Sequence, residues 1–150
     1  MTTNLIGTLK EHTNYVSSVA FNYDGTMLAS GSWDKTIKLW NINTNECAGT
    51  LEGHTMFIIS VAFNHDGKLL ASGSGDNTIK LWDISTKTYI VTLEGHIGAV
   101  NSVAFNGDGL LASGSSDKTI NLWDISTMTL IGILEGHTES VKYVAFNGAG

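Results

Sequence analysis

The stretch GSGDNTIKLWD, residues 73–83, has two near copies in this chain, GSWDKTIKLWN at 31–41 and GSSDKTINLWD at 114–124. These stretches belong to a longer repeat, because the related sequences LKEHT, LEGHT, LEGHI and LEGHT begin at residues 9, 51, 93 and 134, a period of 41 or 42 residues. A fixed period of this size indicates a repeat architecture in which each copy is one supersecondary unit.

Within a copy, the apolar pattern is that of short strands. YVSSVAFN (15–22) is rich in β-branched and aromatic residues and leads into an Asp-Gly turn, a hairpin signal. MLASGS (27–32), the alternating IKLWNI (37–42) and CAGTLE (47–52) follow, separated by polar turns. No stretch has a helical apolar stripe. We therefore predict an all-β chain with four short antiparallel strands in each copy.

Four strands in each copy of roughly 40–45 residues, with Gly-His and Trp-Asp dipeptides, resemble the WD-repeat family of β-propellers. The resemblance rests on Gly53-His54, Gly95-His96, Gly136-His137, Trp82-Asp83 and Trp123-Asp124. The first copy departs from this pattern at Glu11-His12 and Trp40-Asn41, changes that the family commonly tolerates. The resemblance covers the whole chain and implies a β-propeller fold of four-stranded antiparallel blades.

The resemblance predicts one propeller segment over residues 1–150, with repeats at about 9–50, 51–92 and 93–133 and a partial repeat at 134–150. LIGTLK (5–10) is expected to be a lone fourth strand, and VKYVAFN (141–147) a lone first strand. Known propellers have 4–8 blades, so three blades form an incomplete ring. Either the chain is part of a longer propeller, or copies of it associate head to tail and close the ring.

Each full copy also carries a His, a Ser and an Asp, the residue types of nucleophilic hydrolysis. One active site needs one such set, whereas this chain has three, and it has no Gly-x-Ser-x-Gly elbow. The resemblance instead implies that these residues and a strand tryptophan form a buried, hydrogen-bonded tetrad. The predicted tetrads are His12, Ser30, Asp34 and Trp40; His54, Ser72, Asp76 and Trp82; and His96, Ser113, Asp117 and Trp123. Ser32, Ser74 and Ser115 lie on the same strand faces, which leaves the choice of serine open.

Trp33 has no counterpart in the other copies, where Gly75 and Ser116 take its place. The resemblance places its turn on the top face of the propeller, around the mouth of the central channel. Exposed aromatic residues are typical of interface hot spots. We therefore predict a partner-binding site at Tyr15, Trp33, Phe57 and Ile59, which the third copy replaces with smaller or polar residues. The alternative is that Trp33 folds over a neighbouring loop and shields strand edges.

Composition argues against several classes of partner. The net charge is −6, and the eight basic residues are scattered lysines, so no arginine offers a bidentate contact to phosphate or guanine. Nucleic acid and anionic membranes are therefore poor candidates. No apolar run approaches the ~20 residues that span a bilayer, and the first residues do not resemble a signal peptide. With one cysteine, Cys47, the chain is expected in the cytoplasm or the nucleus.

Four of the five histidines recur at the repeat period and so fall on different copies, which argues against a shared metal site. No cofactor is predicted either. The sequence thus predicts a non-catalytic scaffold that binds a protein or peptide through the top face. The alternative is a regulatory or sensor propeller segment of a larger multidomain enzyme whose catalytic domain lies outside this chain. A third possibility is a propeller whose only role is assembly.

Overall fold

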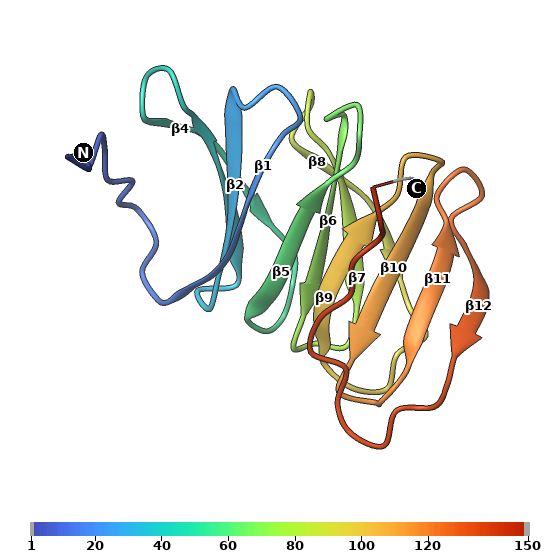
Figure 1. The fold of residues 1–150 in the computed structure, drawn as a ribbon. Helices are drawn as coiled ribbons and strands as arrows, with labels where there is room; N and C mark the ends of the chain where they lie inside the picture. The colour runs from blue at the N-terminus through green and yellow to red at the C-terminus, as the bar shows by residue number, and fades with distance from the viewer. Residues whose placement is uncertain (1, 149–150) are drawn as a thin grey trace.

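The computed structural model describes residues 2–148, which form three antiparallel sheets of four strands each (Figure 1). These residues contain no helix, and therefore none that is long and apolar enough to cross a membrane. The first sheet contains β1 (Val16–Phe21), β2 (Met27–Ser32), β3 (Thr36–Asn41) and β4 (Glu46–Glu52). The second contains β5 (Ile58–Phe63), β6 (Leu69–Ser74), β7 (Ile79–Asp83) and β8 (Thr88–Leu93). The third contains β9 (Val100–Phe105), β10 (Leu110–Ser115), β11 (Ile120–Asp124) and β12 (Thr129–Leu134). The predicted all-β fold of four-stranded blades is confirmed, and each sheet is called a blade below.

The first hairpin of each blade closes through its turn residues rather than through proline, which the chain lacks. In the first blade, the Asn22 side-chain oxygen accepts the backbone N–H of Met27 over 3.0 Å. Asp24 accepts the N–H and the hydroxyl of Thr26, and Gly25 takes a φ of 75°, which a residue without a Cβ adopts at little cost. The Asp-Gly signal in the sequence therefore sets the register of β1 against β2.

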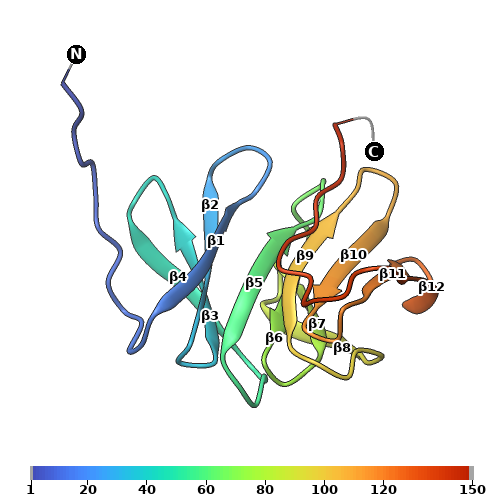
Figure 2. The ribbon, with the colours of Figure 1, turned by 60° about the horizontal axis from the view of Figure 1, so that its bottom comes forward.

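The three blades stack side by side, with the first strands β1, β5 and β9 adjacent along one side (Figure 2). The core lies between blades. Leu39 and Leu51 of the first blade pack with Val61 and Trp82 of the second. The second and third blades pack through an equivalent cluster. Each internal interface therefore joins two blade faces. One is the face that a blade turns toward the blade after it in sequence, called its C-terminal side below. The other is the face that the next blade turns back toward it, called its N-terminal side.

A serine hydroxyl repeats across each of these junctions. Ser18 accepts the backbone N–H of Val61 over 3.2 Å, and Ser60 accepts that of Val103 over 3.2 Å. Because the first strands carry this bond at equivalent positions, it aligns each blade with its neighbour. The recurrence of serine at this place in the three full copies could have revealed the contact from sequence alone.

The two segments expected to be lone strands, 5–10 and 141–147, have no strand assignment in the structure. Both segments lie outside the three sheets, as expected for lone segments, and they carry no strand assignment because a ladder needs a neighbouring strand. The second segment nevertheless packs on the third blade, with Val141 and Val144 buried against Ala112. Of the predicted partial repeat at 134–150, the last two residues lie outside the described part of the chain, as does Met1.

Candidate functional site

In the second blade, four predicted side chains form a continuous hydrogen-bonded chain. The His54 Nδ1 atom lies 2.7 Å from the Asp76 carboxylate, and its Nε2 atom lies 2.7 Å from the Ser72 hydroxyl. Trp82 donates its indole N–H to the same hydroxyl over 2.9 Å. Because an ionised carboxylate can only accept, the proton sits on Nδ1, and Nε2 accepts the hydrogen of the serine. Each of these four side chains therefore has a hydrogen-bond partner within the set.

The first and third blades contain the same arrangement. In the third blade, His96 lies 2.8 Å from both the Asp117 carboxylate and the Ser113 hydroxyl, and the Trp123 indole lies 2.9 Å from that hydroxyl. In the first blade, the corresponding distances among His12, Asp34, Ser30 and Trp40 are 2.7, 2.7 and 2.8 Å. The structure thus brings the predicted sets of four residues together, each within its own blade.

The second serine of each blade has a different task. The Ser74 hydroxyl accepts the backbone N–H of Asp76 over 3.1 Å and donates to the Phe57 carbonyl over 2.9 Å. Ser32 and Ser115 accept the equivalent N–H groups, each over 3.0 Å. These serines hold the turn that carries the aspartate, and the histidine and tryptophan contact Ser30, Ser72 and Ser113 instead.

Each tetrad aspartate has both of its oxygens occupied. In the second blade, one oxygen of Asp76 accepts the N–H and the hydroxyl of Thr78, and the other accepts His54 and the N–H of Thr55. The threonine two residues after the aspartate was not singled out from the sequence. Its recurrence at Thr36, Thr78 and Thr119 was the available signal.

These contacts set the ionisation of the tetrad. Burial raises the pKa of the Asp117 carboxyl, but hydrogen bonds from Thr119 and His96 outweigh that effect and hold the pKa at about 2. The pKa values of Asp34 and Asp76 are lowered by the same balance. Burial lowers the pKa of the His54 imidazole, and the neighbouring Asp76 opposes that shift only in part. At neutral pH the second tetrad therefore contains a charged carboxylate and a neutral imidazole.

The Asp-His-Ser order resembles a hydrolytic triad, but the serine is badly placed for attack. Ser72 and Ser113 are fully buried, and the indole N–H already occupies the hydroxyl oxygen of each. A nucleophile must reach its substrate, so burial argues for a structural role. Within residues 2–148, no group of three or more His, Cys, Asp or Glu side chains is arranged to hold a metal ion.

Three aromatic side chains form a contiguous surface cluster on the first two blades, called the aromatic cluster below. The Trp33 ring lies edge-to-face with Tyr15 at a centroid distance of 5.2 Å, and it lies 5.3 Å from Phe57 on the second blade. Tyr15 is 70% exposed and Trp33 is 46% exposed. The backbone N–H of Trp33 donates to the Tyr15 carbonyl over 2.9 Å, which fixes the turn beside the first strand.

The structure explains why this tryptophan occurs only once. In the second blade, the Phe57 ring lies over Gly75, the residue equivalent to Trp33, and a Cβ added there would lie 2.8 Å from the ring. In the third blade, Ala99 replaces Phe57, and Ser116 accepts a hydrogen bond from Asn101 over 3.1 Å. Trp33 therefore covers the junction between the first and second blades. At the equivalent positions, the second blade carries a glycine and the third carries a serine that is hydrogen-bonded to Asn101.

Ile59, the fourth residue predicted at this site, occupies a different kind of position. The register of β5 against β6 shifts between Ile58 and Ser60, so Ile59 is a bulged, half-buried residue. In the first blade, the equivalent residue binds the second blade, and in the third blade it binds the segment 141–147. The Ser17 hydroxyl lies within hydrogen-bonding distance of the Ile58 carbonyl, and the Asn101 amide donates to the Val141 carbonyl over 2.9 Å. Sequence reasoning missed this inter-blade role.

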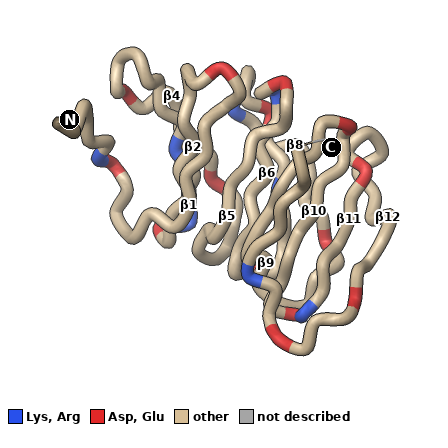
Figure 3. The backbone as a smooth tube through the Cα atoms, in the orientation of Figure 1, with Lys and Arg blue, Asp and Glu red and all other residues tan. Residues whose placement is uncertain are grey.

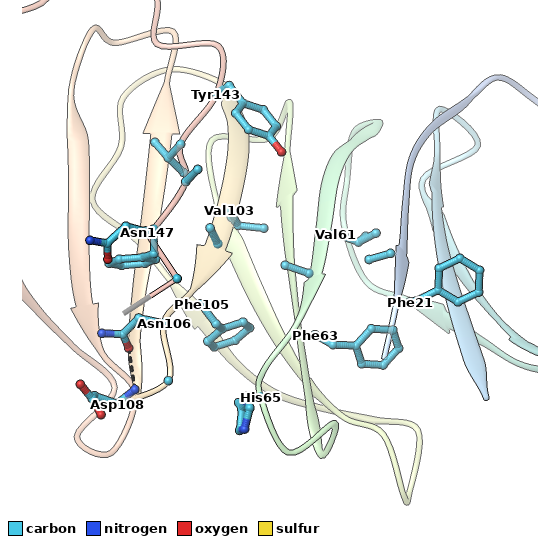
Figure 4. Close-up of a pocket in the computed structure, with 18 of the residues that line it drawn as sticks. Phe21, Val61, Phe63, His65, Val103, Phe105, Asn106, Asp108, Tyr143 and Asn147 are labelled. Carbon is cyan, nitrogen blue, oxygen red and sulfur yellow. Dashed lines mark hydrogen bonds between the residues drawn. The ribbon is translucent and has the colours of Figure 1, made fainter. Parts of the chain in front are cut away.

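A separate groove of about 660 Å³ crosses the first strands, with Phe21, Phe63, Phe105 and Tyr143 along it (Figure 4). Its walls repeat the Val-Ala-Phe sequence that ends each first strand. His65 and Asp108 lie near its rim, but no set of charged groups converges within it (Figure 4). The groove follows from the repeat itself, whereas the aromatic cluster is the feature in which the copies differ.

Comparison with known proteins identifies the repeat. The family model described as "WD domain, G-beta repeat" matches residues 3–41, 45–83 and 87–124. The second and third matches each extend from the fourth strand of one blade through the third strand of the next. Among solved structures, the crystal structure of RRP9 WD40 repeats superposes with a TM-score of 0.88 at 26% identity, covering 90% of this chain and 43% of that chain.

Single stretches also resemble curated proteins. Over 41 residues, the chain is 54% identical to the periodic tryptophan protein 2 homolog of Schizosaccharomyces pombe, covering 27% of this chain and 5% of that protein. Over 36 residues, it is 53% identical to the guanine nucleotide-binding protein subunit beta of the same organism, covering 24% of this chain and 12% of that protein. The matches therefore span a small part of these relatives.

Proposed function

This chain belongs to the WD-repeat family of β-propeller proteins, and we propose that it is a non-catalytic scaffold that binds a protein or peptide. WD repeats generally mediate protein–protein interaction, and propellers of this family are typically non-catalytic. The binding surface that we propose is the propeller face formed by the β2–β3 turns and the loops that precede β1, β5 and β9. On this face lie Tyr15, Trp33 and Phe57, with Ile59 at its edge.

The observation that carries the proposal is the Trp33 ring, which is half exposed between two other aromatic rings. Rigid aromatic side chains bury a large area at a small cost in conformational entropy, which makes them frequent interface anchors. The rings of Tyr15 and Phe57 support the indole from two sides and limit its rotation. A ring that is held in place before binding loses little entropy when a partner covers it.

Charge supports a protein or peptide partner over nucleic acid or a membrane. Figure 3 shows the lysines separated from one another and interspersed with acidic residues. Without a basic stripe or an arginine, the surface offers no track for a phosphate backbone or anionic headgroups. The single half-buried thiol of Cys47 is consistent with the cytoplasm, with the nucleus as the alternative location that we propose.

The tetrads support a structural role for their twelve residues in this scaffold. Each tetrad ties the loop before the first strand to the second and third strands, and its polar groups satisfy one another. A catalytic role for the protein would then require a domain outside this chain, with the propeller segment as its regulatory or sensor part. The tetrads thus position the loops that carry the proposed binding face.

Tryptophan fluorescence tests the binding site directly. Trp40, Trp82 and Trp123 are at most 3% exposed, so Trp33 is the tryptophan that acrylamide can reach. Peptides selected on the folded chain from a random displayed library should protect this fluorescence from quenching. Peptides that bind with unchanged quenching would place the binding site elsewhere on the molecule.

We also propose that the two outer faces of the blade stack are covered, either by further blades of a longer propeller or by copies of the chain that associate head to tail. Val19 on the N-terminal side of the first blade is 60% exposed, whereas its equivalents Val61 and Val103 are each 5% exposed at internal interfaces. Leu134 on the C-terminal side of the third blade is 50% exposed, against 2% for Leu51 and 3% for Leu93. Each of these two faces is therefore one half of an interface that the chain already forms internally twice.

A further inference from the structure

The first hairpin turn of each blade contains one variable residue, and in the first two blades this residue carries a ring. Tyr23 and His65 occupy equivalent places in the sequences NYDGT and NHDGK. Their ring centroids lie 4.9 Å apart, and the angle between the ring planes is 57°. The two rings therefore meet across the junction between the first and second blades, at the end of the blades opposite the β2–β3 turns.

The third blade has no ring at this place. Gly107 takes the equivalent position, in a turn at 106–109 that is one residue shorter than the turns at 22–26 and 64–68. A Cβ added at Gly107 would meet no atom within 4 Å. His65 therefore contacts a ring of the first blade, whereas residue 107 of the third blade offers it no side chain.

A pocket of about 320 Å³ lies at this second junction and is called the junction pocket below. His65 of the second blade lines it together with Phe105 and Ile125 of the third. Figure 4 shows the Phe105 ring above His65, with the turn at Asn106 and Asp108 across from them. All of its lining residues lie between 64 and 125, so the pocket is formed by two complete blades.

Hydrogen bonds hold both walls of the junction pocket in place. On the second blade, the Asn64 side-chain oxygen accepts the backbone N–H of Leu69 over 2.9 Å. On the third blade, the Asn106 side-chain oxygen accepts the N–H groups of Asp108 and Leu110 over 3.0 and 2.8 Å. Both turns are therefore fixed before a ligand enters, and a preformed site loses little entropy on binding.

We propose that the junction pocket binds an aromatic side chain of a protein or peptide partner. The incoming ring takes the place of the side chain that residue 107 lacks, and it contacts His65 as His65 contacts Tyr23 at the first junction. The Phe105 ring and the buried Ile125 favour an aromatic group, because ring pairs gain more than their buried area alone. His65 and Gly107 are exposed, so a side chain can enter from solvent. This site is separate from the aromatic cluster, which lies at the other end of the blades.

Two small probes test the pocket by nuclear magnetic resonance of the isotope-labelled chain. N-acetyl-tyrosinamide carries a ring on a peptide-like backbone, and N-acetyl-leucinamide is the matched probe without a ring. The tyrosine probe should shift the backbone amide signals of residues 64–66 and 106–110, with a Kd of about 1–10 mM as expected for so small a ligand. The leucine probe should bind about fivefold more weakly, because it lacks the ring–ring contacts.

Gly107→His fills the pocket from within, because it gives the third turn the residue that the second turn carries. The space around the added Cβ is open and the backbone there is not left-handed, so the variant should fold and should lose the shifts. His65→Ala removes a ring from the wall and should weaken binding without filling the pocket. Ile97→His is the control, since Ile97 is 87% exposed at the other end of the blades and the change should leave binding unaltered.

Shifts at these amides that Gly107→His abolishes and Ile97→His retains would support the junction pocket. The proposal is overturned if the tyrosine probe causes no shift there at about 20 mM, or if both probes bind equally well. Shifts that persist unchanged in Gly107→His would also overturn it. Shifts confined to Tyr15, Trp33 and Phe57 would assign the probe to the aromatic cluster, which refutes this second site and leaves the proposed function standing.

Discussion

The indole N–H of Trp82 donates to the hydroxyl of Ser72 over 2.9 Å, between two side chains that water does not reach. This bond joins the third strand of the blade to the second, and through His54 it reaches the loop before the first strand. A buried hydroxyl that loses both partners costs the full desolvation of the group.

Trp82→Ala should therefore lower the free energy of unfolding by about 3–5 kcal/mol, because it removes this bond and leaves a cavity between the first two blades. His54→Ala should act in the same direction, because it removes one hydrogen-bond partner from Asp76 and one from Ser72 and leaves a cavity between them. Urea denaturation followed by circular dichroism measures both changes. A midpoint within a degree or two of the parent in a thermal scan would contradict the structural role of the tetrad.

Serine-directed probes should fail on the folded chain. A fluorophosphonate needs an accessible, activated hydroxyl, whereas Ser72 and Ser113 are fully buried and Ser30 is 4% exposed. Intact mass spectrometry after incubation should show no adduct at any of the three serines. Stoichiometric labelling of one of them before unfolding would revive the hydrolase interpretation.

The free energy of unfolding should fall in two steps as the pH is lowered. Because burial lowers the pKa of His54 below 6.5, the unfolded chain binds a proton that the folded chain refuses, and stability falls as the pH drops below about 6.5. The lowered pKa values of Asp34, Asp76 and Asp117 add a second loss as the pH falls below about 3.8. Melting temperatures between pH 8 and pH 2.5 would show both steps.

A pair of variants assigns the first step. His54→Gln should flatten the slope between pH 5 and 6.5, whatever its cost at neutral pH. His65→Gln, at an exposed imidazole whose ring centroid lies 4.9 Å from that of Tyr23, is the control for the substitution itself. An unchanged slope in the first variant would mean that another group titrates there.

Much of this architecture could be predicted from the sequence, because the residues that build it recur in every copy. The choice between Ser30 and Ser32 could not, since both lie on one strand face and only the turn geometry separates the tetrad contact from the bond to the Asp34 N–H. The strands expected at 5–10 and 141–147 have the right residues but no neighbour. The contact between the Trp33 and Phe57 rings depends on the angle between blades, which no local pattern encodes.

Gly75→Ser should disturb the aromatic cluster without unfolding the blade. The added Cβ would meet the tip of the Phe57 ring at 2.8 Å, and the flexible side chain can move aside. We expect a stability change of less than about 1 kcal/mol. The emission spectrum of Trp33, measured as the difference between the variant with and without Trp33→Ser, should shift. An unchanged spectrum would contradict the placement of Phe57 over Gly75.

Trp33→Ser restores the residue that the third copy carries and should lower stability by only about 1–2 kcal/mol, the cost of two half-exposed ring contacts. Binding of a selected peptide should weaken by about 2 kcal/mol, or about thirty-fold, as expected for a hot-spot residue. Isothermal titration calorimetry measures the affinity, and denaturation measures the stability.

Phe57→Ser should weaken the binding of the same peptide, because it removes one of the two rings that hold the Trp33 indole in place. Ser116→Ala, on the third blade, is the matched control and should change the affinity little. If Trp33→Ser unfolds the chain, Trp33 is a packing residue, and the binding site lies elsewhere.

The middle blade of the stack packs against a complete blade on both sides, and each outer blade on one side. Local unfolding should therefore be more frequent in the outer blades. The second blade is enclosed by two complete interfaces, through Leu70 and Trp82 on one side and Ile79 and Leu81 on the other. Within residues 2–148, the first and third blades each have one complete interface. In a linear array, opening starts at the ends and reaches the middle last. Amide hydrogens of β6 and β7 should therefore exchange with deuterium more slowly than their counterparts in β2 and β3 or in β10 and β11.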